Sequence, residues 1–89
     1  MSSEFTLVKT CSADAFDAIP RKLINIDISK AVESLKHAGY SIVADAGRLC
    51  VVEKGGVEMT LYSSGRVLVK TAREEIARQA AEQLYSCIL

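Results

Sequence analysis

The side chains able to do nucleophilic, acid–base or metal chemistry are few in this sequence of 89 residues. His37 is the only imidazole, and Cys11, Cys50 and Cys87 lie far apart with no Cys-x-x-Cys pair among them. Zinc sites and disulfide frameworks need closely spaced or paired cysteines. The sequence therefore predicts no metal, no cofactor and reduced thiols, with Cys50 and Cys87 serving as small core residues.

Enzymatic motifs are also absent from the pattern of residues. A thiol nucleophile could be paired with His37, but no local signature supports a Cys–His pair, and His37 suits the last turn of a helix. Gly55-Gly56 lies between two apparent strands, so it lacks the helix N-terminus that phosphate loops use. Turns and helix ends account for the carboxylates. We expect that the protein is not an enzyme and has no catalytic residue.

Length and charge limit the class of protein further. The 89 residues are 49% hydrophobic and suit one domain over 1–89, with a thin core that a partner or a second copy would help to stabilise. The 11 basic residues balance the 11 acidic ones, which removes the strong positive field of an autonomous nucleic-acid binder. No apolar run is long enough for a membrane span, and no leader pattern opens the chain. We expect a cytoplasmic protein with no membrane contact.

The first half of the chain must supply one strand and one helix. Residues 4–10 alternate between apolar and polar side chains, which predicts a half-buried strand. The segment 11–27 gives no clear pattern, because Pro20 interrupts any longer helix, and its conformation is left open. From Ile28 apolar residues recur at helical spacing, with Asp27 as the N-cap and Gly39 after the end.

The second half predicts four strands and a helix. Segments 41–45, 48–54, 57–62 and 66–70 are separated by Ala46-Gly47, Gly55-Gly56 and Ser63-Ser64-Gly65, which favour three consecutive hairpins. Thr71-x-x-Glu74 fits a capping box, and the helix that follows carries an apolar stripe. That stripe consists of Ile76, Ala77, Ala80, Leu84, Cys87 and Ile88.

These elements predict a two-layer α+β domain of order β-α-β-β-β-β-α, in which two helices back one face of a curved antiparallel sheet of about five strands. The covered face is predicted to hold Val57, Met59, Leu61, Val67 and Val69. The opposite face is left to solvent or to a partner, and this open face is the first indication of function.

The stretch from Leu61 to Val69, with its aromatic residue, Ser-Ser-Gly turn, Arg66 and β-branched strand, is followed by Thr71-Ala72 and an Ala-rich helix. This pattern resembles one half-repeat of the TATA-box-binding protein family over about fifteen residues. The resemblance implies a TBP-like fold, a curved sheet backed by two helices, whose concave face inserts aromatic side chains into the DNA minor groove.

Carried over by position, the resemblance gives Tyr62 the place of an inserting aromatic residue. Arg66 takes the place of a basic residue that contacts the DNA backbone, and Leu68 that of a valine that contacts the groove. Lys70 replaces a threonine of the motif, and Leu49 falls near the family's second inserting aromatic residue. Because the family has two halves in one chain, an equivalent saddle would need a homodimer. Similar single domains accompany type-three ribonuclease H enzymes, which implies an RNA–DNA hybrid as an alternative ligand.

Two hypotheses follow for the open face. In the first, a non-catalytic TBP-like domain binds DNA or an RNA–DNA hybrid weakly and in a salt-sensitive way, because Glu58 and the zero net charge oppose phosphate binding. In the second, the domain is a protein-interaction or assembly module, docking through this face or through the end of the last helix, at Leu84, Tyr85, Ile88 and Leu89. A solvated Tyr62–Arg66 pair and a small-ligand pocket between copies are the remaining alternatives. The candidate site residues for DNA, hybrid or protein are Thr60, Tyr62, Arg66, Leu68 and Lys70.

Overall fold

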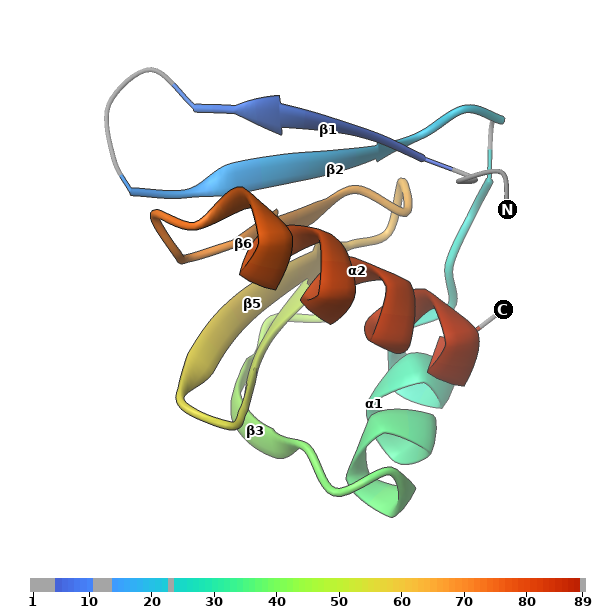
Figure 1. Ribbon diagram of the computed structural model, residues 1–89. Coiled ribbons are helices and arrows are strands. Elements are labelled where there is room, and N and C mark those ends of the chain that lie inside the picture. The colour runs from blue at the N-terminus through green and yellow to red at the C-terminus, as the bar shows by residue number, and fades with distance from the viewer. Residues whose placement is uncertain (1–4, 11–13, 23, 89) are drawn as a thin grey trace.

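Six strands and two helices make up the chain in the computed structural model, which describes residues 5–10, 14–22 and 24–88 (Figure 1). In chain order the elements are β1 (Phe5–Lys9), β2 (Phe16–Pro20), α1 (Ile28–His37), β3 (Ser41–Asp45), β4 (Leu49–Lys54), β5 (Val57–Tyr62), β6 (Val67–Val69) and α2 (Glu74–Ile88). The predicted α+β class, the helix from Ile28 and the three hairpins are therefore confirmed.

All six strands form one antiparallel sheet, in the order β1-β2-β6-β5-β4-β3. The expectation of about five strands, and of β1 leading directly to α1, is wrong because β2 lies in the segment left open. Phe16 and Ala18 of β2 turn inward, and Pro20 ends the strand, where a missing N–H is tolerated. The pairing of residues 16–18 with the distant β6 (Val67–Val69) makes this segment a central strand, and no local pattern indicates such a partner.

The helix ends follow the sequence at α1 and depart from it at α2. The Asp27 side chain accepts a hydrogen bond from the Lys30 amide at 3.3 Å, and Gly39 follows α1 with φ of +93°. The capping box expected at Thr71 is wrong: α2 begins at Glu74, because the Thr71 hydroxyl accepts from the Arg73 amide at 3.2 Å and closes a turn of its own.

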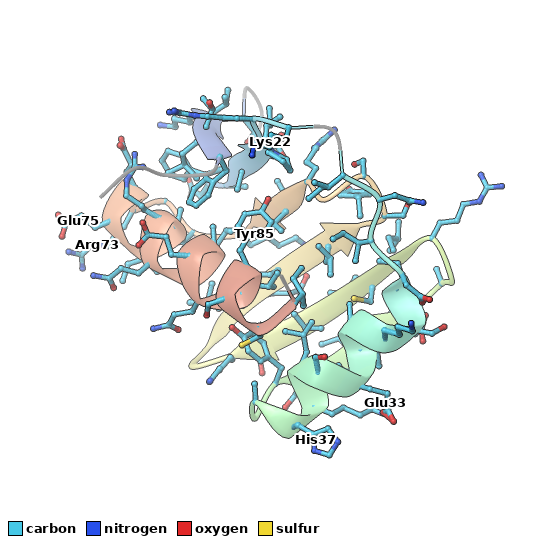
Figure 2. All side chains as sticks on the ribbon, turned by 90° about the vertical axis from the view of Figure 1, so that its right-hand side faces the viewer. Lys22, Glu33, His37, Arg73, Glu75 and Tyr85 are labelled. Atoms are coloured by element: carbon cyan, nitrogen blue, oxygen red, sulfur yellow. The ribbon has the colours of Figure 1, made fainter. Side chains whose placement is uncertain are left out.

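Both helices lie on one side of the sheet (Figures 1 and 2), where α1 packs on β3 and β4, and α2 packs on β2 and β6. Of the residues predicted to face them, Val57 is only half-buried and the rest are fully buried. From α2 the core takes Ala77, Ala81, Leu84 and Tyr85, two of them outside the predicted stripe. Leu84 and Tyr85 are therefore unavailable as the predicted docking end of that helix, and Leu89 lies outside the described residues.

Tyr85 ties α2 to the middle of the sheet (Figure 2). Its hydroxyl lies 2.5 Å from the Gly65 carbonyl oxygen and 3.3 Å from that of Ala18, so its single proton is donated chiefly to Gly65. Its ring packs on Phe5 with centroids 5.3 Å apart. Burial raises the pKa of Tyr85, which keeps the hydroxyl protonated as a donor.

Gly65 is the point at which the β5–β6 turn meets three other segments. Its φ is +91°, and a Cβ there would collide with the Ile24 side chain and lie 3.0 Å from Cγ of Pro20. The same turn accepts a hydrogen bond at the Ser63 carbonyl from the Ile26 amide, at 2.7 Å. Both the backbone conformation and the space exclude a side chain at residue 65.

We expect Gly65→Ala to destabilise the fold more than Gly39→Ala, although the two backbones have nearly equal φ. Gly39 has open space around a new Cβ, so its alanine meets only the left-handed backbone strain of about 1–2 kcal/mol. Gly65→Ala adds overpacking against Ile24 and Pro20, which costs about 1–3 kcal/mol more. Urea unfolding of both variants measures the difference, and equal losses would contradict the packing described here.

Tyr85→Phe should lower the free energy of unfolding by about 1–3 kcal/mol, because it leaves the buried carbonyl of Gly65 without its donor. Tyr40→Phe is the matched control, since Tyr40 is also a buried residue, but its hydroxyl oxygen is not itself buried and makes no hydrogen bond among the described residues. The two variants are compared by urea unfolding. If Tyr40→Phe lowers the free energy of unfolding as much as Tyr85→Phe does, the stabilising role of the Tyr85–Gly65 hydrogen bond is contradicted.

Candidate binding face

The open face of the sheet brings together all five residues singled out from the sequence. Thr60 pairs with Leu68 across β5 and β6, and Tyr62 and Lys70 follow at two-residue spacing on the same side. Arg66 stands just before β6 with its guanidinium carbon 5.1 Å from the centre of the Tyr62 ring. The residues share a face, but the structure also supplies each cation with a partner.

Arg66 is held within the domain by a carboxylate from β2. Its Nε donates to Asp17 Oδ1 at 3.0 Å while the guanidinium stacks on Tyr62, and the Asp17 side chain is only 17% exposed. The Asp17 carboxylate therefore offsets the charge of Arg66 and helps to orient its side chain. The predicted solvated Tyr62–Arg66 pair is thus extended to three residues.

Lys70 is paired in the same way. Its Nζ lies 2.7 Å from Glu58 Oε2, and Glu53 stands opposite Glu58 in the register of β4 and β5. The two cations and three carboxylates around the site leave it with one net negative charge rather than a positive field. Asp17 and Glu58 therefore offset the charge of both cations, which weakens their attraction for phosphate groups.

Aliphatic side chains run across the middle of this face between the two ion pairs. Thr60 is at the centre and is only 8% exposed, because Leu68 and Val51 flank it on the neighbouring strands. The described residues include three exposed large hydrophobics, Val8 (44%), Ile19 (42%) and Val43 (58%), all from strands of this sheet. One cross-strand row of the register is Val8, Asp17, Leu68, Thr60, Val51 and Ala44.

Asp17 is the ion-pair partner at this site that sequence reasoning missed. It lies in the segment left without a conformation, and its partner Arg66 is 49 residues away in the chain. Phe16 and Ala18 on either side of it are apolar, which is the one local signal of a strand with Asp17 on the opposite face. Nothing local indicates which cation it meets.

The described cysteines and the histidine lie apart from this face. Cys50 is fully buried, and burial, then the nearby Asp45 carboxylate, raises the pKa of its thiol, so it packs as the predicted small core residue. Cys87 is half-buried and Cys11 lies outside the described residues. His37 points away from the body of the protein at the end of α1 (Figure 2). The described residues contain no group of three potential metal ligands.

One open groove of about 460 Å³ lies beside the start of α1, and the Asp27 side chain in its lining is engaged in capping that helix. Its lining comprises Ile24, Asn25, Ile26, Asp27, Lys30, Ala31, Ser34 and Ile88. Within the described part of the chain, neither helix combines the length and apolar character that a bilayer span requires. Comparison with known protein families, curated proteins and solved structures finds no match to this chain.

Proposed function

We propose that this chain is a non-catalytic binding domain that docks a protein partner on the open face of its sheet. The observation that carries the proposal is an aliphatic row, formed by Leu68 and Val51 on either side of the nearly buried Thr60 and bounded by the Arg66–Asp17 and Lys70–Glu58 ion pairs. Such a face matches the anatomy of protein interfaces, which have an apolar centre and a polar rim. The partner is a protein surface with an aliphatic centre.

Tyr62 and Arg66 supply the anchors of this interface. Tyrosine and arginine are enriched among the residues that dominate binding energy, and their side chains are strongest when they are ordered before binding. Here the ring of Tyr62 and the carboxylate of Asp17 hold Arg66 in place. The partner therefore meets a preorganised pair rather than two mobile side chains.

Kinship with the TATA-box-binding protein family is part of the proposal. The order from β2 to α2 is strand, helix, four strands and helix, which supports the kinship, with β1 as an added edge strand. Nucleic-acid binding is less favoured, because the paired cations and the net negative charge weaken phosphate contact. DNA or an RNA–DNA hybrid is thus the alternative occupant that an experiment must distinguish.

Photo-crosslinking from Val51 tests the proposal. We expect a benzophenone amino acid placed there, in cells that make the protein, to form an adduct with a distinct protein other than this chain. The same group at Gln79, on the exposed side of α2, is the matched control and should give no such adduct. Leu68→Asp puts an unpaired charge into the aliphatic row. This variant should reduce the yield of the Val51 adduct at least tenfold.

Three results would contradict this function. They are an adduct with nucleic acid alone, equal protein adducts from Val51 and Gln79, and a Val51 adduct that Leu68→Asp leaves unchanged. Circular dichroism of each variant establishes that the fold is intact before its crosslinks are compared.

A further inference from the structure

The two edges of the sheet are built differently. At the β3 edge the register shifts between Ile42 and Ala44, so Val43 is an extra residue that interrupts the ladder. At the β1 edge all five residues pair regularly with β2, and Lys9 is the only charge on the strand. Bulges and charges are the usual devices that stop an edge from pairing with another strand. The β3 edge carries a bulge of this kind, whereas the β1 edge has no bulge and a single charge.

Exposed aliphatic side chains gather at the same unprotected edge, which β1 forms at the top of Figure 1. Val8 of β1 lies on the open face opposite Asp17, and Ile19 lies on that face opposite Thr6. Two of the three exposed large hydrophobics of the described residues are therefore within the outer two strands. Backbone groups and apolar side chains are both left uncovered there.

We propose that a second copy of this chain pairs antiparallel along β1, about a twofold axis at Leu7. In that register every β1 residue has a partner: Leu7 faces Leu7 of the second copy, Thr6 faces Val8, and Phe5 faces Lys9. Antiparallel pairing keeps matching faces together only when residues of the same parity are opposite, and this register satisfies the condition. The proposal is independent of the open-face function.

The pairing creates favourable contacts on both faces of the joined sheet. On the open face, Val8 of each copy faces Thr6 of the other and lies diagonal to the other Val8. Ile19 lies diagonal to Val8 within each copy, so four aliphatic side chains form one cluster. On the helix face, the half-buried Leu7 gains its equivalent as a neighbour. The two Lys9 side chains lie about 14 Å apart, beyond the screening length at physiological salt.

The helices leave room for this arrangement. Because α2 packs over β2 and β6, its equivalent in the second copy lies about four strand spacings away, or about 19 Å. A helix with its side chains is about 10–12 Å across, so the two copies of α2 do not collide. The result is a continuous sheet of twelve strands, six from each copy, that presents two open faces side by side.

Sedimentation equilibrium of the purified chain and of one variant at each edge tests the proposal. We expect the wild-type chain to be a dimer, Val8→Lys to weaken the dimer at least tenfold, and Val43→Lys to leave it unchanged. Both residues are exposed on edge strands, so the same lysine is placed on an exposed residue of each edge. A monomeric wild-type chain, or dissociation by Val43→Lys in place of Val8→Lys, would overturn the proposal.

Hydrogen exchange gives a second measurement that needs no variant. As the concentration of wild-type chain rises, amides of β1 should become protected while those of β3 do not change. Protection that is independent of concentration in β1, or that grows in β3, contradicts a β1 interface even if Val8→Lys fails to fold. Neither measurement involves the open-face partner. Failure of the dimer proposal would therefore leave the proposed function untouched, and that function is tested separately by crosslinking.

Discussion

The structure depends on one buried hydrogen bond, from the Tyr85 hydroxyl to the Gly65 carbonyl. A thin core of two layers has few ways to fix a helix at one position along a sheet, and an alanine-rich helix face offers little shape to do it. The tyrosine supplies that position, because a buried donor and a buried carbonyl are costly to separate. Gly65 makes the contact possible, since any side chain there would push Ile24 and Pro20 away.

The same turn determines the open face. Arg66 comes directly after Gly65, and the turn closes through hydrogen bonds between Tyr62 and Arg66 and between Gly65 and Tyr62. The stacked Tyr62–Arg66 pair is thus positioned from the covered side of the sheet, by a helix that never reaches the open side. Asp17 completes the pair from β2, the strand whose Ala18 carbonyl also lies near the Tyr85 hydroxyl. Core and binding face therefore depend on one set of contacts.

The sequence predicts the parts of this architecture that local chemistry decides. Turn glycines such as Gly47 and Gly65, the Asp27 cap and the alternation in β5 and β6 are all local, and the hairpins and α1 follow from them. The five candidate residues share a face for the same reason, since alternation fixes which side they occupy. Local patterns do not carry the pairing of β2 with β6, the Asp17 partner of Arg66 or the burial of Tyr85. Each of these joins residues 20 or more positions apart.

The central claim is that the cations of the open face serve the domain itself, and that the face is shaped for an aliphatic protein surface. Amide NMR of the labelled chain, titrated with duplex DNA and with an RNA–DNA hybrid at low and then physiological salt, tests it most directly. The account predicts no shifts centred on Thr60, Tyr62, Arg66, Leu68 and Lys70 at physiological salt. Saturable shifts centred on those residues, weakening steeply as salt rises, would contradict it and identify a nucleic-acid site instead.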